Sequence, residues 1–301
     1  EQQLLALCRS MDRTHWENTV ICTHGLGSLA DEYAKANVRT VVIGKRRKGD
    51  ILLAARLAKQ IRQHEPDIVH GWLLQGNIWA RLATIGFNRY SVFLAAERTT
   101  ELEITPWLDF VDRYLSRVGD AVVGNSIAVS RYVTDRKRVP IEKVHTIWNG
   151  TDLLRAQKCL RWSEIQKNEQ RLRRSIPDKA YVIVHIAQPI PCKRFDVLAE
   201  VVANLVKEGI DAHLLQLGRD PNTDEERNYL SKFRGWINAY NITDRVHRTG
   251  FVSDISAELS IADVVLHTSD IEGFPNAVIE SLAMEKSVVA TSAGGTSEVL
   301  R

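Results

Sequence analysis

Residues 269–280 read Ser-Asp-Ile-Glu-Gly-Phe-Pro-Asn-Ala-Val-Ile-Glu and directly follow a short β-branched run that is typical of a buried strand. Gly273 permits a tight backbone turn. Pro275 suits the first turn of a helix, because its missing N–H would have no partner there. The stretch therefore predicts a strand, a loop and a helix in succession, which is the unit of a parallel α/β sheet.

Two carboxylates, Glu272 and Glu280, belong to this same stretch. The N–H groups at the start of a helix, together with the positive end of its dipole, form a site for anions. Ionised carboxylates accept hydrogen bonds from hydroxyl groups, as a sugar or a ribose would donate. The stretch thus favours a site for a phosphorylated, hydroxyl-rich ligand. The alternative is that both acids are solvated on the surface.

The alternation of short apolar runs with longer helical segments continues through the chain. Strands are predicted at 19–22, 38–43, 67–70, 92–96, 121–124, 144–148, 181–186, 212–217, 245–249, 263–268 and 287–291. The polar stretch after the turn signal Asn149-Gly150 is typical of a connector. We therefore expect an α/β protein with two Rossmann-like domains whose parallel sheets are covered by helices: 1–155, a connector at 156–178, and 179–301.

The composition, 44% hydrophobic and 26% charged over 301 residues, is that of a globular protein. The four cysteines form no C-x-x-C pair, which argues against a disulfide framework and favours a reducing cytoplasm. No apolar run approaches the roughly 20 residues that span a bilayer. Both ends of the sequence fall inside helical patterns, so we expect the chain to be truncated at both ends.

The motif from Glu272 to Glu280, followed by Ser281-Leu-Ala, Val288-Val-Ala-Thr and Gly294-Gly-Thr-Ser-Glu, closely resembles the donor site of family 4 retaining glycosyltransferases, also called glycosyl transferases group 1. The resemblance implies a GT-B fold of two facing Rossmann-like domains. It also implies that Glu272 lies at the transferred sugar and that Glu280 holds the ribose. The remaining donor-binding positions that it implies are Gly273, Phe274, Pro275, Asn276, Gly294 and Gly295.

A second segment, 186–198, places Lys193 and Arg194 at a predicted helix start, where the dipole disfavours cations unless an anion is near. A bound diphosphate would explain the two cations, and a tolerated surface pair is the alternative. In the family that this segment resembles, an arginine and a lysine clamp the diphosphate. Lys193 aligns with the lysine, whereas Gln188 replaces the arginine, and Arg194 is a candidate to substitute by position.

The predicted acceptor side is less specific. Where the family often has a histidine, this chain has Glu97 and Arg98, which we interpret as acceptor or sugar contacts, with a structural salt bridge as the alternative. His70 ends a predicted strand and is kept as a further candidate contact, although a structural role is favoured for it. His185 also ends a predicted strand, and for it the structural role is favoured.

The resemblance implies a hexosyltransferase-type enzyme that moves a sugar from a UDP- or GDP-sugar to an acceptor hydroxyl with retention, in polysaccharide, glycolipid or cell-envelope glycan synthesis. Lys193 and Glu272 are the predicted catalytic residues. We expect no metal and no cofactor besides the donor, because the nine histidines lack ligand spacing and Asp-x-Asp is absent. Positive charge and helix dipoles would then stabilise the leaving diphosphate.

Two other functions stay open. A nucleotide-sugar epimerase can share this architecture, since a fold does not fix chemistry. A non-catalytic nucleotide-sugar-binding protein is consistent with Gln188 and with Glu285-Lys286-Ser287, where the family favours Gly-x-Pro. A nicotinamide-dependent dehydrogenase is disfavoured, because no G-x-G-x-x-G follows a strand.

Two basic clusters, Lys45-Arg46-Arg47-Lys48 and Arg136-Lys137-Arg138, predict peripheral contact with an anionic membrane and so a glycan or lipid-linked acceptor. The clusters lack interleaved aromatic residues, which argues against nucleic acid as a partner. We therefore expect a cytoplasmic protein at the inner face of the membrane.

Overall fold

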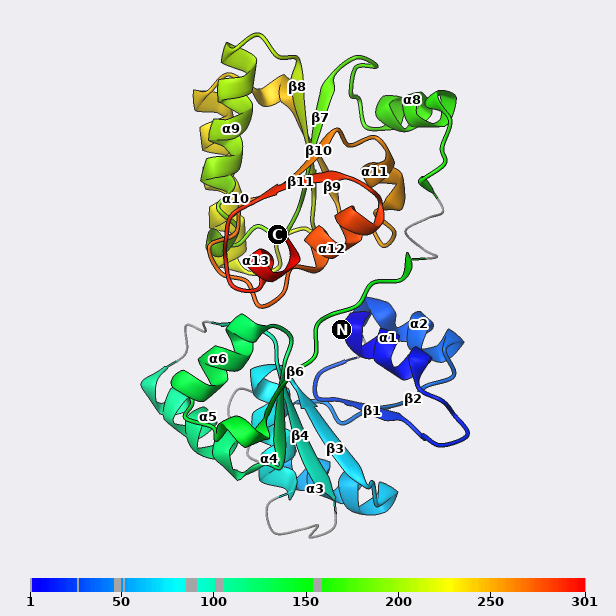
Figure 1. Cartoon of the computed structure of the whole chain (residues 1–301), viewed down its shortest axis with the longest axis vertical. Helices are drawn as coiled ribbons and strands as arrows, with labels where there is room; N and C mark the ends of the chain where they lie inside the picture. Colours follow the sequence, from blue (N-terminus) through cyan, green and yellow to red (C-terminus); the bar gives the residue numbers. More distant parts are fainter. Residues whose placement is uncertain are drawn as a thin grey trace. The chain divides into compact units, whose positions relative to one another are not determined.

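The computed structural model describes residues 2–25, 27–45, 50, 52–84, 91–100, 105–153 and 159–300. The chain divides into two compact units, Glu1–Gly150 and Thr151–Arg301. Each unit contains parallel β-sheet flanked by helices, as Figure 1 shows. The α/β class predicted from the sequence is confirmed.

The first unit contains two parallel sheets. Its strands are β1 (Thr19–Cys22), β2 (Arg39–Val42), β3 (Ile68–Trp72), β4 (Val92–Glu97), β5 (Ala121–Gly124) and β6 (Val144–Thr146). Strand β1 pairs with β2, and the other four pair in chain order. The helices are α1 (Gln2–Ser10), α2 (Ala30–Lys35), α3 (Leu52–His64), α4 (Leu73–Thr84), α5 (Pro106–Val118) and α6 (Ile127–Asp135).

The core of the first unit lies between these helices and the four-stranded sheet. Leu57 and Ile61 on one face of α3 belong to the same buried cluster as Phe93 of β4 and Val122 of β5. Their spacing of four residues brings both α3 side chains to one side of the helix. Burial of this face holds α3 against the sheet.

The second unit contains a five-stranded parallel sheet. Its strands are β7 (Tyr181–Ile186), β8 (Ala212–Leu217), β9 (Val246–Gly250), β10 (Val264–His267) and β11 (Ser287–Ala290), in the spatial order β11-β10-β7-β8-β9. The helices are α8 (Glu164–Arg173), α9 (Phe195–Lys207), α10 (Asp224–Ala239), α11 (Ser256–Ser260), α12 (Asn276–Ala283) and α13 (Thr296–Val299).

Alternate residues of the central strands supply a core on each face of this sheet. Ile183 of β7 packs with Phe195 of α9 and Phe233 of α10, whereas the neighbouring Val182 packs with Leu259 of α11. Successive side chains of a strand point to opposite faces, so a strand covered on both sides is apolar throughout. Figure 1 shows α9 and α10 on one side of the sheet and α8 and α11 on the other.

Helix α8 lies within the stretch that the sequence predicts to be a connector. It begins with a capping box in which Ser163 and Gln166 satisfy each other's backbone N–H groups. Gln170 of α8 donates a hydrogen bond to Glu258 of α11, at 3.1 Å. The residues from 159 onward in this stretch therefore pack within the second unit, and residues 154–158 lie outside the described part.

The strand order locates one topological switch point in the second unit. From β7 the chain continues to β8 and β9 on one side and later returns to β10 and β11 on the other. The loops that leave the carboxyl ends of β7 and β10 therefore diverge, and ligands of open parallel sheets bind in the crevice at such a point. The segments 186–198 and 269–280 contain these two loops.

Candidate functional site

The structure brings Lys193 and Glu272 together at this switch point. Lys193 ends a short 3-10 turn (Pro191–Lys193) after β7, and Glu272 lies in the loop after β10. The Lys193 ammonium forms an ion pair with the Glu272 carboxylate, although the two residues are 79 positions apart in the sequence. Both predicted catalytic residues therefore share one site.

His267, the last residue of β10, completes this cluster. Its Nε2 lies 3.1 Å from Oε1 of Glu272. Burial alone would raise the pKa of Glu272, but the close contact with His267 and the charge of Lys193 lower the pKa to about 2. Glu272 is therefore a carboxylate at neutral pH. His267 was not predicted from the sequence, where its only signal was its place near the end of a predicted strand.

Buried polar atoms without a protein partner lie beside this cluster. His185 of β7 is fully buried, and neither ring nitrogen has a hydrogen-bond partner among the described residues. Burial, then the charges of His267 and Lys193, lowers the pKa of His185 to about 3, so the ring is neutral. The Ser269 hydroxyl, in the loop after β10, is also buried and unpaired within the described chain. Such groups are uncommon in proteins, and a polar ligand or a water molecule would satisfy them.

Arg194 is the N-cap residue of α9 and has a left-handed backbone, with φ of 49°. Its guanidinium forms ion pairs with Asp196 at 2.9 Å and with Asp270 at 3.1 Å. The backbone N–H of Asp270 also donates to the Cys192 carbonyl, at 2.8 Å. Arg194 thus joins the loops after β7 and β10, and carboxylates compensate its charge.

Gln188 lies beside a guanidinium that was not predicted from the sequence. Arg219, from the loop after β8, donates from Nη2 to the Gln188 side-chain oxygen, at 3.1 Å. Arg219 also pairs with Glu226 at the start of α10, at 2.5 Å. A positive group therefore stands next to the position where the resembling family has an arginine. Its only sequence signal was its place just after a predicted strand.

The predicted helix start after Gly273 is present. Pro275 is the N-cap residue of α12, and Phe274, Asn276 and Glu280 are half-buried along the loop and helix. The alternative of fully solvated acids therefore does not describe Glu280.

Gly294, in the loop after β11, fixes the position of the Glu272 loop. It has φ of 48°, and a Cβ atom built on it would lie 1.7 Å from the Glu272 carbonyl oxygen. The N–H of Gly295 donates to the Gly273 carbonyl, at 3.1 Å. The close approach predicted for these glycines is present at Gly294.

In the first unit, Glu97 is buried in a charge cluster. The Lys137 ammonium lies 2.7 Å from a carboxylate oxygen of Glu97 and 2.7 Å from one of Asp112. Burial alone would lower the pKa of Lys137, but the charges of Glu97 and Asp112 raise it, so the ammonium stays charged. Of the two alternatives for Glu97, the structure fits the structural salt bridge. The partner is Lys137 rather than Arg98, so Lys137 does not belong to an exposed basic cluster.

Arg98, which follows β4, and His70 both lie beside Trp72, the last residue of β3. The prediction that His70 ends its strand is wrong, because β3 continues for two residues beyond it. The Arg98 guanidinium lies 4.9 Å from the Trp72 ring centroid and donates to the Asn149 side chain at 2.5 Å. Burial lowers the pKa of Arg98 to about 10. Burial, then the charge of Arg98, lowers the pKa of His70 to about 4, so this ring is neutral. Arg98 and His70, both predicted as acceptor or sugar contacts, therefore lie on the same aromatic side chain. Trp72 itself was not predicted.

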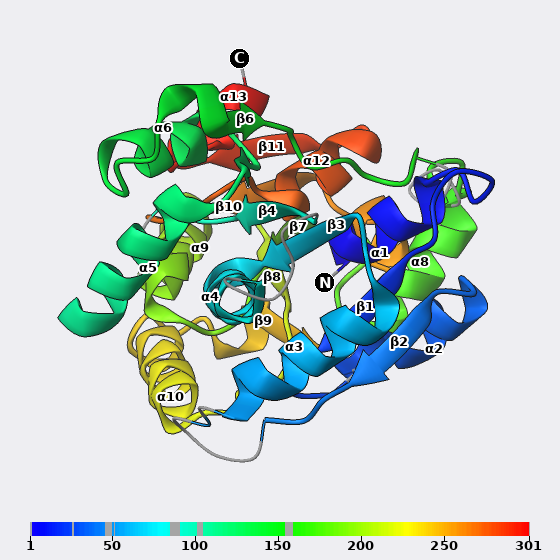
Figure 2. The same cartoon turned by 90° about the horizontal axis from the view of Figure 1, so that it is seen from below.

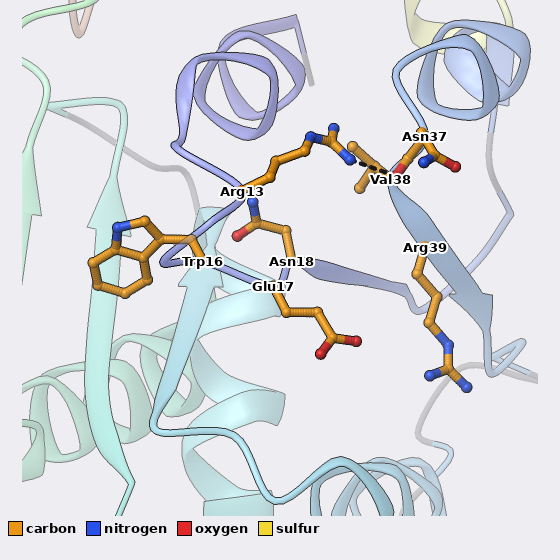
Figure 3. A pocket seen from close by; sticks show the side chains of 7 residues that line it. All are labelled: Arg13, Trp16, Glu17, Asn18, Asn37, Val38 and Arg39. Atoms are coloured by element: carbon orange, nitrogen blue, oxygen red, sulfur yellow. Dashed lines mark hydrogen bonds between the residues drawn. The ribbon is translucent and has the colours of Figure 1, made fainter.

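A separate surface crevice of the first unit lies at the amino-terminal ends of β1 and β2. Figure 3 shows its lining, with Arg13 reaching across to the segment before β2. Arg13 donates to the Asn37 carbonyl, at 2.9 Å. Because ligands of parallel sheets bind at the carboxyl ends of strands, this crevice is not the expected site.

No group of three or more His, Cys, Asp or Glu side chains within the described ranges is arranged to bind a metal ion. The absence of a metal from the reaction stays a prediction. In the same ranges, no helix combines the length and apolar character needed to cross a membrane. Of the predicted basic cluster at 45–48, only Lys45 is described, and the rest lies outside the described residues.

Two protein families match the chain, one for each unit. The family "Glycosyltransferase Family 4" matches residues 1–155, and "Glycosyl transferases group 1" matches residues 166–301.

Curated relatives agree with these matches. The chain is 26% identical over 257 residues to "Putative glycosyltransferase EpsD" of Bacillus subtilis (strain 168), a match that covers 82% of this chain and 64% of the relative. It is 24% identical over 257 residues to "N-acetyl-alpha-D-glucosaminyl L-malate synthase" of Bacillus anthracis, covering 84% of this chain and 63% of the relative. The chain thus spans less than two thirds of the length of either relative.

Solved structures share the fold. A glycosyltransferase from Rickettsia africae superposes with a TM-score of 0.81 at 20% identity, covering 100% of this chain and 77% of that one. Anabaena Alr3699/HepE, described in complex with UDP-glucose, gives a TM-score of 0.84 at 18% identity, covering 99% of this chain and 79% of that one.

Proposed function

Because the chain belongs to glycosyltransferase family 4 and its second unit matches glycosyl transferases group 1, we propose that it transfers a sugar from a nucleoside-diphosphate sugar to an acceptor hydroxyl with retention of configuration. Its fold is the GT-B type that the sequence predicts. The observation that carries the proposal is the cluster of Lys193, Glu272 and His267 at the switch point between β7 and β10.

Lys193 would bind the diphosphate of the donor. An ammonium aimed at the leaving phosphate stabilises the negative charge that grows as the bond to the sugar breaks. In the structure this ammonium pairs with Glu272, so we infer that the donor competes for Lys193 when it binds. Arg219, beside Gln188, would supply the second positive group at the diphosphate.

Glu272 would hold the transferred sugar, and Glu280 the ribose. An ionised carboxylate accepts hydrogen bonds from sugar hydroxyls, and the low pKa of Glu272 keeps it ionised. The backbone N–H groups of Phe274 and Asn276, on either side of Pro275, would contact the sugar and the phosphate at the start of α12. We assign no nucleophile to the protein, because attack by the acceptor on the donor's own face preserves configuration.

We propose a UDP-sugar as the first donor to test. Structures of the Anabaena relative are described in complex with UDP and with UDP-glucose. GDP-sugars stay the second candidates. The acceptor would be a hydroxyl of a glycan or a lipid-linked glycan in polysaccharide, glycolipid or cell-envelope synthesis, and the reaction would need no metal or further cofactor.

Calorimetric titration of the full chain with UDP-, GDP- and ADP-glucose tests this function. We expect one donor class to bind, and Lys193→Gln or Arg219→Gln to weaken that binding at least about tenfold, since each removes a charge-assisted contact to phosphate. Glu280→Ala should weaken it as well. The matched control is Lys207→Gln, at the exposed opposite end of α9, which should leave binding unchanged.

Three outcomes would contradict the proposal in different ways. If the folded protein bound none of the donors, the proposal that it is a transferase would be wrong. Tight donor binding without transfer to any acceptor would indicate a non-catalytic binding protein. Conversion of the free nucleotide sugar to its epimer without an acceptor would indicate the epimerase.

A further inference from the structure

Helix α5 of the first unit exposes its large apolar side chains. Trp107, Phe110, Tyr114 and Val118 retain 71%, 64%, 61% and 51% of their accessible surface. Their spacing of three or four residues places them on one side of the helix. The rings of Trp107 and Phe110 stack with centroids 6.2 Å apart. These residues therefore form a continuous apolar face, which we call the α5 face.

The buried side of α5 is more polar than the exposed side. Asp112, Leu115 and Ser116 are its buried residues. A helix at the surface of a globular protein normally turns its apolar stripe toward the core and its polar side chains toward water. Helix α5 instead turns four large apolar side chains to water while Asp112 is buried, so its outward face needs a physical explanation.

The buried charge cluster fixes this orientation. Asp112 pairs with Lys137, which also pairs with Glu97 of β4. Rotating α5 to bury Trp107 would remove Asp112 from Lys137, and an unpaired buried charge is strongly unfavourable. The fold thus keeps the α5 face exposed at the cost of three buried charges. Figures 1 and 2 both show α5 at the edge of the first unit.

A basic rim borders the α5 face at its carboxyl-terminal end. Arg117 is exposed on the last turn, and its Nε donates to the Lys137 carbonyl at 3.2 Å, so the segment 136–138 lies beside this turn. No described carboxylate forms an ion pair with Arg117, Arg136 or Arg138. The charged side chains near this end of α5 are Arg117, Arg136, Arg138, Lys143, Asp120, Asp135 and Glu142. The rim is therefore net positive.

We propose that the α5 face docks on an anionic lipid surface. Tryptophan and tyrosine concentrate at membrane interfaces, and amphipathic helices with aromatic residues and nearby basic groups lie in the plane of the interface. Trp107 and Phe110 insert among the lipids, and the arginines of the rim contact the phosphates. The same rim disfavours a second copy of this face as the occupant, because the two positive rims would repel. This docking is independent of the transferase function.

Vesicle sedimentation with the full chain tests the docking. We expect binding to vesicles that contain phosphatidylglycerol, weaker binding to phosphatidylcholine alone, and weakening at high salt. Trp107→Ala/Phe110→Ala should lower the partition coefficient at least about tenfold, because two large apolar side chains no longer leave water. Arg117→Gln/Arg136→Gln/Arg138→Gln should remove the preference for anionic vesicles. Both variants alter exposed residues, and circular dichroism checks that they fold.

The matched control is Ile165→Ala/Leu172→Ala on α8, whose side chains are 73% and 77% exposed in the second unit. It should bind vesicles like the wild type. The proposal is overturned if the wild type binds no vesicle or if the control loses as much binding as the α5 variant. It is also overturned if ultracentrifugation shows a dimer that dissociates in the α5 variant while vesicle binding is unchanged. Loss of donor binding would not affect the result.

Discussion

Gly294 holds a backbone position that a larger residue cannot occupy without moving the Glu272 loop. Its φ is 48°, and an added Cβ would lie 1.7 Å from the Glu272 carbonyl oxygen. We expect Gly294→Ala to lower the free energy of unfolding by more than the roughly 1–2 kcal/mol of a left-handed alanine, and to weaken donor binding. Urea denaturation and calorimetry measure the two effects.

Gly209→Ala separates the effect of the left-handed backbone from the effect of the contact with the Glu272 loop. Gly209 has φ of 82°, but no atom lies within 4 Å of the place that an added Cβ would take, so only the backbone term applies. Equal losses in the two variants would show that the contact with the Glu272 loop is unimportant.

Glu272 makes stability depend on pH. Its pKa is about 2 in the folded protein against 4.5 for the ordinary group, so the folded state favours the carboxylate. The stabilisation is complete above about pH 4.5 and is lost as the pH falls toward 2. We expect Glu272→Gln to lose about 3 kcal/mol at pH 7 and progressively less below pH 4.5. Urea unfolding of both proteins at pH 7, 5 and 3.5 measures this, and a difference that is independent of pH would contradict it.

Only part of the site could be predicted at the scale of single residues. Lys193 and Glu272 belong to motifs whose neighbours identify them. His267 ends β10 and Arg219 follows β8, and a single histidine or arginine has no sequence pattern that predicts its contacts. The partner of Glu97 was also beyond sequence reasoning, because Lys137 is 40 positions away and packs through the fold.

At the scale of elements, Lys137 attaches helix α5 to strand β4. It is 2% exposed and neutralises both Glu97 and Asp112. We expect Lys137→Met to lower the free energy of unfolding by about 3–5 kcal/mol, because it leaves buried carboxylates without a cation. Guanidinium denaturation measures the loss. Arg136→Met, the exposed neighbour, should change stability by no more than about 0.5 kcal/mol, and a similar loss in both would contradict the role of the cluster.

Strands could be predicted from the sequence where their burial on both faces requires a run of apolar residues. The predicted strands at 19–22, 121–124, 181–186 and 212–217 have the bounds of β1, β5, β7 and β8. Parallel strands covered on both faces are apolar throughout, and turn residues end them. Helix α8 was missed because it is polar on most sides, and its stability comes from its cap and its contact with α11. The orientation of α5 was unpredictable for the opposite reason, since a distant ion pair overrides its apolar stripe.

At the scale of the whole chain, each unit has buried clusters of its own. Phe93 and Val122 belong to a core of the first unit, and Phe195 and Phe233 to a core of the second. A domain with its own core can unfold on its own. The sequence indicated two such units from the turn at Asn149-Gly150, where the structure divides the chain. The predicted connector boundaries stay a prediction.

Scanning calorimetry of the full chain should therefore resolve two transitions. The proposed donor contacts lie in the second unit, so UDP at a hundred times its Kd should stabilise that unit by about 2.7 kcal/mol and raise its midpoint by roughly 5–10 °C. Glu272→Gln should lower the same transition, whereas Lys137→Met should lower the other. If UDP raised the transition that Lys137→Met lowers, the two units would unfold as one, and the assignment of donor binding to the second unit alone would lose its support.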